Sequence, residues 1–188
     1  MKPRLKEHYE NVVIQNLQKK YSMSNKNMVP KFVKIVLNMG LGIEGNDKKK
    51  LKSCIDDMSL ISGQLPVITK FKKSISNFKT RKGTPAGLKV TLRRDMMYEF
   101  IDRLVNIALP RVKDFKGLNL KGVDNFGNYS FGIKEHIIFP EINFDKVDRI
   151  RGLDVTIVVS SKDKQLTIDL LKEMNFPFIK KDSEVKSN

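Results

Sequence analysis

The chain has 188 residues, of which 40% are hydrophobic, and a formal net charge of +15. This length suits one domain of ordinary size or two small ones, with enough apolar residues to build a core. A single cysteine, Cys54, excludes a disulfide framework and a four-cysteine zinc site. No apolar run approaches the ~20 residues of a membrane-spanning helix, and the first ten residues lack an apolar signal core. We therefore expect a protein of the cytosol, or one made inside an organelle.

The chain begins with a predicted helix over residues 3–20, for which Pro3 suits the first turn. Its apolar positions at helical spacing are Leu5, Tyr9, Val12, Val13 and Leu17. Residues 32–39 alternate as a strand. We expect its buried face to carry Val33, Ile35, Leu37 and Met39, and its other face to carry Lys34, Val36 and Asn38.

A glycine-rich turn over residues 40–46 leads into a predicted helix over residues 47–61. Asp47 lies near the N-terminus of this helix, and Gly63 is expected to cap its end. The apolar stripe of the helix is Leu51, Cys54, Ile55, Met58 and Ile61. A short strand over residues 67–69 is expected to follow.

Residues 58–94 form a run of 37 residues without a carboxylate. The nine basic residues in this run are Lys70, Lys72, Lys73, Lys79, Arg81, Lys82, Lys89, Arg93 and Arg94. A basic surface without compensating acids attracts a polyanion. Because Pro66, Gly83, Pro85 and Gly87 interrupt any amphipathic helix, the pattern favours a nucleic acid over an anionic membrane. Within the run, residues 88–92 alternate as a strand, with Lys89, Thr91 and Arg93 facing outward.

Further along the chain, Asp95 is expected to cap a helix over residues 95–108 that Pro110 ends. The expected buried residues of this helix are Met97, Phe100, Ile101, Leu104 and Ala108. Short strands are predicted at residues 129–133 and 137–139, and a longer one at 153–160. Ser161 is expected to cap the last helix, which extends to about Met174. Residues 181–188 are typical of a frayed polar tail.

The mixture of helices and alternating strands predicts an α+β protein. We expect a single domain over residues 1–180. Its mostly antiparallel sheet carries helices on one face and leaves the other face open. The polar and basic residues predicted on the open face suit RNA.

The segment Gly40–Gly45 fits the pattern G-x-G-x-x-G between a strand and a helix, which is the setting of a dinucleotide-binding turn. Three features oppose a nucleotide there, one being that the position expected for a ribose-binding acid falls within the run without carboxylates. Glu44 and Asp47 would repel a pyrophosphate, and Pro66 interrupts the next strand. We therefore favour a tight turn that brings backbone close to its neighbours. A dinucleotide-dependent oxidoreductase stays open as a second interpretation.

Other chemistry-bearing residues are dispersed. His8, Cys54 and His136 lie far apart in the sequence, so neither a metal site nor a catalytic thiol is expected. The acids after residue 134 alternate with lysine and arginine, which favours a salt-bridged surface over a magnesium site. That surface is able to bind a protein of mixed charge. Phe71 is expected to anchor the basic loop, whereas base stacking and anchoring both stay open for Phe78.

Four stretches carry a resemblance to the bacterial-type ribosomal protein L5 family. They are Ile35–Gly42, Leu60–Ser74, Phe78–Leu92 and Gly127–Thr156. The Phe176-Pro177-Phe178 ending fits as well, so the resemblance covers residues 3–180. Two positions depart from the family pattern, where Phe71 replaces a small residue and His136 replaces glutamine.

The resemblance implies a structural role rather than a catalytic one, with no cofactor, metal, small-molecule substrate or membrane partner. Members bind 5S rRNA and large-subunit rRNA and help attach 5S rRNA in the central protuberance. The rRNA-facing residues carried over are Lys34, Asn38, Gln64, Lys70, Lys89, Thr91 and Arg93. Amide and hydroxyl groups suit 2′-OH groups and base edges, and the cations suit phosphates.

The resemblance also implies two further contacts. An exposed loop at about residues 76–85 would reach P-site tRNA through Phe78, Lys79, Arg81 and Lys82. A mixed-charge region would bridge to a small-subunit protein through Arg111, Lys113, Lys134, Glu141, Asp145 and Arg149. The expected location is the ribosome, in the cytoplasm or in an organelle. An RNA-processing enzyme and a generic RNA chaperone also stay open as functions for a basic α+β protein.

Overall fold

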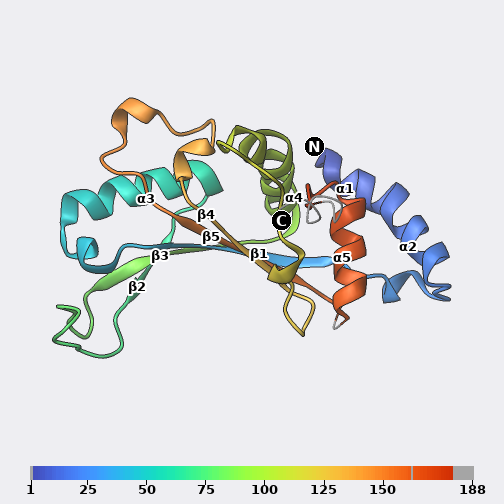
Figure 1. The fold of residues 1–188 in the computed structure, drawn as a ribbon, viewed down its shortest axis with the longest axis horizontal. Helices are drawn as coiled ribbons and strands as arrows, with labels where there is room; N and C mark the ends of the chain where they lie inside the picture. Colours follow the sequence, from blue (N-terminus) through green and yellow to red (C-terminus); the bar gives the residue numbers. More distant parts are fainter. Residues whose placement is uncertain (1, 162, 180–188) are drawn as a thin grey trace, which may run out of the picture. The chain divides into compact units, whose positions relative to one another are not determined.

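The computed structural model describes residues 2–161 and 163–179. Over these residues, five strands form one sheet in the order β2-β3-β1-β5-β4 (Figure 1). The strands are β1 (Phe32–Gly40), β2 (Val67–Lys70), β3 (Pro85–Leu92), β4 (Tyr129–Ile133) and β5 (Leu153–Val159). The α-helices are α1 (Arg4–His8), α2 (Ile14–Lys20), α3 (Lys48–Ser62), α4 (Arg94–Arg103) and α5 (Lys164–Glu173). The predicted α+β class is confirmed.

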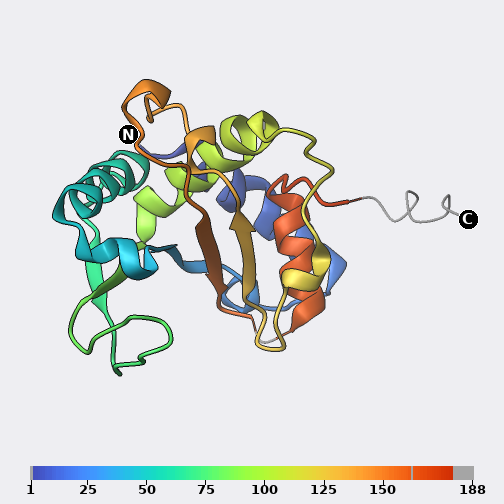
Figure 2. The same cartoon turned by 60° about the vertical axis from the view of Figure 1, so that its left-hand side comes forward.

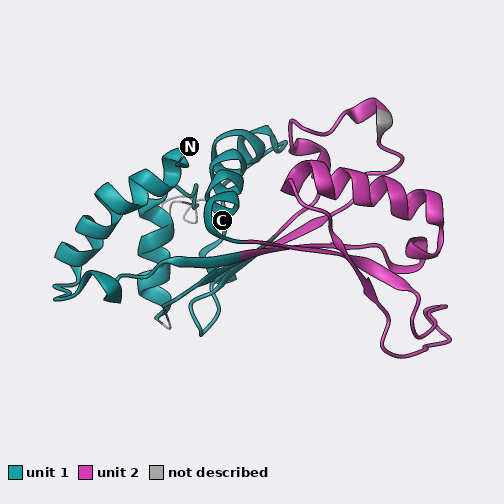
Figure 3. Cartoon of the chain, turned by 180° about the vertical axis from the view of Figure 1, so that it is seen from behind, with its two compact units in different colours: residues 1–34, 93–131, 156–188 teal, residues 35–92, 132–155 magenta. Residues whose placement is uncertain are grey.

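The chain divides into two compact units (Figure 3). Unit 1 consists of residues 1–34, 93–131 and 156–188, and it contains α1, α2, α4 and α5. Unit 2 consists of residues 35–92 and 132–155, and it contains α3, β2 and β3. No helix among the described residues is both long and apolar enough to cross a membrane.

The N-terminal helix of unit 1 confirms the helix predicted over residues 3–20. It continues from α1 to α2 through a π-helical turn at Tyr9–Val13. Tyr9 is buried, and its hydroxyl donates a hydrogen bond to the backbone oxygen of Pro30 at 2.9 Å. Val12, expected on the apolar face, is exposed.

The starts of α4 and α5 differ from the predicted ones. Asp95 does not cap α4, because Arg93 occupies the N-cap position and the Asp95 carboxylate pairs with Lys6 Nζ at 2.8 Å. Asp163, rather than Ser161, caps α5 by accepting a hydrogen bond from the backbone N–H of Gln165 at 2.9 Å. The five residues predicted to be buried in the helix after Asp95 are all buried.

In unit 2, helix α3 covers one face of the sheet (Figure 1, Figure 2). Asp47, expected near the N-terminus of this helix, is its N-cap and accepts a hydrogen bond from the backbone N–H of Lys49 at 2.9 Å. Gly63 ends it in the left-handed conformation, with φ of 68°. Cys54, Met58 and Ile61 are buried, so the predicted stripe faces the core.

Three local predictions need correction or have no test. Val33 is exposed, so the buried alternation of β1 starts at Ile35 rather than at residue 33. The strand predicted over residues 137–139 is a 3-10 turn at His136–Ile138, because the chain there folds back toward Arg151 instead of pairing in the sheet. The polar tail predicted over residues 181–188 lies outside the described residues.

Candidate nucleic-acid interface

The surface of unit 2 that faces away from α3 is built on β3, which pairs antiparallel with both β1 and β2. Lys89 lies opposite Asn38 on β1 and opposite Val67 on β2, so these three residues form one row across the sheet. In a neighbouring row, Thr91 lies opposite Val36. Side chains alternate between the two faces of a strand, and the intervening residues of β1 and β3 are buried. The outward residues are therefore exposed or half-buried.

Asn38 is positioned by a neighbour that sequence reasoning missed. Its amide nitrogen donates to Asp154 Oδ2 on β5 at 3.4 Å. This places a carboxylate on a face where only neutral and basic groups were predicted. The contact joins residues 116 positions apart, so nothing local in the sequence indicates it.

Gln64 is held by the end of α3. The buried Ser62 hydroxyl accepts a hydrogen bond from the Gln64 backbone N–H at 3.2 Å and donates one to the Gln64 backbone oxygen at 2.9 Å. The Gln64 side chain is exposed. Lys70, at the end of β2, is also exposed and follows a register shift at Thr69/Lys70.

Two further residues carried over for rRNA binding belong to unit 1. Lys34 is half-buried on β1, and Arg93 is exposed at the N-cap of α4. The structure therefore brings together Asn38, Lys89 and Thr91 in adjacent rows of unit 2, and it assigns Lys34 and Arg93 to the other unit.

The loop between β2 and β3 is folded on itself (Figure 2). Its base is closed by hydrogen bonds from the Phe71 N–H to the Thr84 oxygen at 3.0 Å and from the Gly83 N–H to the Phe71 oxygen at 2.9 Å. Closer to the tip, Ile75 and Thr80 form an antiparallel bridge.

The loop tip presents an aromatic ring with basic neighbours. Phe78 is 66% exposed, which contradicts the anchoring interpretation for this residue. Lys79, Arg81 and Lys82 are exposed beside it in the sequence. Phe71 is half-buried at the loop base.

The mixed-charge segment at residues 134–152 is fastened to unit 2 by Arg151. This arginine is only 6% exposed, and its guanidinium donates to Asp148 at 2.8 and 2.9 Å and to Glu44 at 3.3 Å. The hydrogen bonds from Arg151 hold the pKa of Asp148 at about 2. Burial alone would raise the pKa of Glu44, but the hydrogen bonds from Arg149 and Arg151 outweigh it and lower the pKa.

His136 is the buried member of the polar cluster that Arg151 forms with Asp148 and Glu44. It is fully buried, its Nδ1 lies 3.1 Å from the Arg151 backbone nitrogen, and its Nε2 lies 3.5 Å from Asp57 Oδ2. Burial raises the pKa of Asp57, although the nearby His136 ring acts to lower it. The departure at His136 therefore lies in the interior of unit 2, rather than on a contact surface.

The six residues expected to bridge to a protein are not all in one unit. Arg111 and Lys113 are exposed in unit 1. The other four belong to the segment at residues 134–152 of unit 2. There Arg149 forms an ion pair with Glu44, Glu141 is half-buried, and Lys134 and Asp145 are exposed. Sequence reasoning missed Phe144, which is 67% exposed in a turn that Asn143 caps.

The glycine-rich turn does not form a dinucleotide site. It folds as a 3-10 turn at Gly42–Asn46, and the strand before it pairs antiparallel with β3 instead of joining a parallel βαβ unit. Glu44 binds the arginines of the mixed-charge segment. Gly45 permits the close approach expected of such a turn, since a Cβ there would lie 2.6 Å from the Pro85 oxygen.

Comparisons with known proteins agree with this arrangement. A family described as "Ribosomal protein L5" matches residues 25–81, and "ribosomal L5P family C-terminus" matches residues 85–178. The chain is 60% identical over 181 residues to large ribosomal subunit protein uL5 of Pelagibacter ubique (strain HTCC1062), covering 96% of this chain and 98% of that relative. It is 54% identical over 175 residues to uL5 of Geobacter sulfurreducens, with coverage of 93% and 98%.

These similarities define the class of the protein as a structural, non-enzymatic component of the large ribosomal subunit. The chain belongs to the ribosomal protein L5 family. The resemblance stated from the sequence is therefore confirmed. The two enzyme interpretations, an RNA-processing enzyme and a dinucleotide-dependent oxidoreductase, are wrong.

Proposed function

We propose that this large-subunit protein binds 5S rRNA through the face of unit 2 that carries Asn38, Lys89 and Thr91, and helps attach that RNA in the central protuberance. The observation that carries the proposal is the antiparallel register, which places Lys89 directly opposite Asn38 and Thr91 in an adjacent row. A strand surface of this kind offers donors and acceptors at fixed spacing. Amide and hydroxyl groups of this kind recognise RNA through 2′-OH groups and base edges.

The charges on this face suggest where the RNA backbone runs. Lys70 and Lys89 are exposed on β2 and β3, where a phosphate gains from a cation. Asp154 on β5 would repel a phosphate, and it is hydrogen-bonded to Asn38. We place the boundary of the RNA footprint at Asp154, with the backbone on the β2 side of Asn38. Lys34 and Arg93 of unit 1 and the exposed Gln64 are further proposed contacts to 5S or large-subunit rRNA.

The proposal assigns the folded loop between β2 and β3 to P-site tRNA. Backbone hydrogen bonds close the loop, so holding its tip in place costs less conformational entropy than holding an unstructured chain. Lys79, Arg81 and Lys82 would bind the tRNA backbone, and the exposed Phe78 ring would stack on a base or sugar.

A contact with a small-subunit protein is assigned to the segment at residues 134–152. This segment carries acids and bases in equal number, within a chain of net charge +15. Balanced charge gives RNA no net attraction and suits a protein surface of mixed charge. Phe144 supplies the exposed apolar group that protein interfaces use as an anchor, and Glu141, Asp145, Lys134 and Arg149 would form the charged rim. Arg111 and Lys113 are proposed as further contacts from unit 1.

The deciding experiment measures binding of the whole protein to 5S rRNA and to a tRNA competitor at two salt concentrations. The test variant is Asn38→Ala/Gln64→Ala/Thr91→Ala. A matched control, Asn11→Ala/Gln15→Ala/Ser24→Ala, removes the same kinds of polar group from exposed positions of unit 1. We expect preference for 5S rRNA at physiological salt in the wild type and the control, and its loss in the test variant.

Two outcomes contradict the proposal. Equal affinity of the wild type for both RNAs would leave the basic face as a generic polyanion surface, as in an RNA chaperone. A preference that survives in the test variant would move the 5S site away from the rows that Asn38 and Thr91 occupy.

A further inference from the structure

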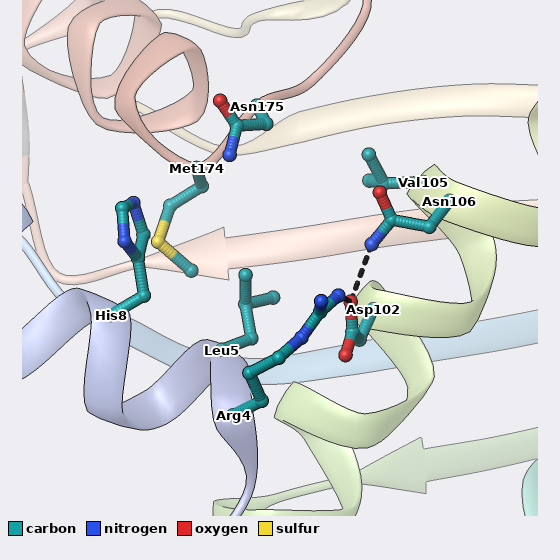
Figure 4. A pocket seen from close by; sticks show the side chains of 8 residues that line it. All are labelled: Arg4, Leu5, His8, Asp102, Val105, Asn106, Met174 and Asn175. Atoms are coloured by element: carbon teal, nitrogen blue, oxygen red, sulfur yellow. Dashed lines mark hydrogen bonds and ion pairs between the residues drawn. The ribbon is translucent and has the colours of Figure 1, made fainter.

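Unit 1 contains a pocket that the proposed contacts do not use. It has a volume of about 270 Å³ and lies among α1, the π-helical turn Leu104–Ala108 that follows α4, and the end of α5 (Figure 4). Pockets for drug-sized ligands usually occupy about 300–1,000 Å³, so this one suits a single small ring system. Nothing in the contacts proposed above requires a cavity at this place.

The inner wall of the pocket is apolar. It is formed by Leu5 from α1, Val105 from the π-helical turn and Met174 at the end of α5. All three side chains are buried, and Met174 is fully so. Such a wall favours a flat ligand that gives up its contact with water on one face.

The rim of the pocket provides hydrogen-bonding groups. Asn106 is exposed, and its amide nitrogen donates to Asp102, so its side-chain oxygen is left to accept a further hydrogen bond. Asn175 is exposed in the left-handed conformation, with φ of 60°. Within the described part of the chain, its side-chain amide makes no hydrogen bond. The rim therefore offers amide donors and acceptors of the kind that bind the edge of a nucleobase.

A planar cation lies at the mouth of the pocket. The Arg4 side chain is 77% exposed, and its Nη2 lies 2.7 Å from Asp102 Oδ1. Figure 4 shows the Arg4 guanidinium reaching across toward Asp102 and Asn106. The ion pair orients the guanidinium while leaving its faces accessible. Guanidinium planes stack on unpaired bases of RNA.

We propose that this pocket binds one unstacked nucleobase of ribosomal RNA. In this arrangement the base lies on the partly accessible side chains of Leu5 and Val105, stacks under the Arg4 guanidinium, and presents its edge to Asn106 and Asn175. RNA is favoured over an apolar side chain of a protein because the chain is a strongly basic component of the large subunit, and because the rim is polar. Unit 1 thereby gains an RNA contact independent of the sheet face in unit 2.

The test uses complete large subunits that carry the protein. Ultraviolet crosslinking followed by mass spectrometry identifies nucleotides attached to peptides containing residues 4–8 or 173–175. Alkylation of unpaired bases then reports whether the same base is shielded. The blocking variant is Asn106→Trp, which places a large ring at the exposed rim. The matched control is Ile107→Trp, because Ile107 is exposed on the next position of the same turn but does not line the pocket.

We expect one unpaired base to crosslink to these peptides in wild-type subunits and to be shielded from alkylation. In Asn106→Trp subunits the crosslink yield falls by about tenfold or more, because the inserted ring keeps the base out of the pocket, and the base becomes reactive. Ile107→Trp subunits behave like the wild type. A second variant, Asn175→Gly, keeps the left-handed backbone and removes only the amide, and it should reduce the crosslink without a change in thermal unfolding.

The proposal is overturned if no base crosslinks to these peptides, if the crosslink survives in Asn106→Trp, or if the peptides crosslink to another protein instead. Failure here is distinguishable from failure of 5S rRNA binding through unit 2. The 5S proposal is tested by the Asn38→Ala/Gln64→Ala/Thr91→Ala variant, which leaves the pocket intact, and the pocket proposal is tested by the crosslink in subunits with Asn106→Trp, a substitution that leaves the sheet face intact.

Discussion

Arg151 donates two hydrogen bonds to the carboxylate of Asp148, at 2.8 and 2.9 Å, although the two residues are only three positions apart in an irregular segment. The pair is bidentate, which fixes the guanidinium plane as well as its position. Because the same guanidinium also reaches Glu44, the segment at residues 134–152 is joined to the turn that precedes α3. The mixed-charge surface is therefore attached to the core of unit 2 by a buried cation.

Replacing this cation should destabilise the protein. Arg151→Met leaves Asp148 and Glu44 without their buried partner, and we expect a loss of about 2–3 kcal/mol in the free energy of unfolding, since both acids keep some contact with water. Urea unfolding followed by circular dichroism measures it. Arg149→Met is the control, because its exposed ion pair with Glu44 should contribute about 1 kcal/mol or less. Equal losses in the two variants would refute the assignment of Arg151 as the anchor.

Acid should weaken the same attachment. Asp148 has its pKa held at about 2 in the folded protein, below the ordinary value of about 3.9. Its contribution to stability is therefore present above about pH 4–5 and is lost as the pH falls toward 2. Unfolding measured between pH 6 and pH 2 should show a smaller decline for Asp148→Asn than for the wild type. Parallel curves for the two proteins would show that the pair does not stabilise the fold.

The lysines of the sheet face should set the salt dependence of 5S rRNA binding. Each phosphate contact contributes about 0.7–0.9 to the slope of log affinity against log salt concentration. We expect Lys70→Ala/Lys89→Ala to reduce the magnitude of that slope by about 1.4–1.8. The control is Lys48→Ala/Lys50→Ala, which removes two exposed lysines from α3 on the other face. If the control reduces the slope as much as the test variant, the RNA does not lie on the proposed face.

Phe144 should matter for subunit association and not for folding. Its ring is 67% exposed, so Phe144→Ala removes little buried area and should leave thermal unfolding unchanged. If the ring is an interface anchor, association of large with small subunits weakens by about tenfold, measured by light scattering. Phe126→Ala in unit 1 is the matched control, since that ring is 72% exposed. An unaltered association constant in Phe144→Ala subunits would remove the anchor from the proposal.

Local chemistry explains which elements the sequence predicted well. The burial of Ile35, Leu37 and Met39 on β1, the place of Asp47 near the start of α3 and the Gly63 end of α3 each depend on neighbouring residues, and each was predicted. The predicted cap of α5 was wrong because Ser161 and Asp163 are both good capping residues. Only the path of the folded chain decides which of them caps the helix. The prediction that Asp95 caps α4 failed for a different reason. Its carboxylate accepts a hydrogen bond from Lys6, which lies 89 positions away in the sequence.

In the candidate site, too, the features set by local sequence were predicted and those set by long-range contacts were not. The outward positions of β1 and β3 follow from period-two alternation, so Asn38, Lys89 and Thr91 were predicted on one face. The polar cluster of Glu44, His136 and Arg151 was not predicted, because its ion pair spans 107 positions. The sequence does not distinguish a buried arginine from a solvated one, because burial is decided by the tertiary fold.

The order of the strands has a consequence for the edge of the sheet at β2. β2 is at the edge of the sheet, and its four residues include the exposed Val67. An uncovered edge is a template on which another chain can add a strand. Here the edge is short, the register shifts at Thr69/Lys70, and a lysine stands at its end. This edge therefore offers little flat backbone on which a second copy could extend the sheet.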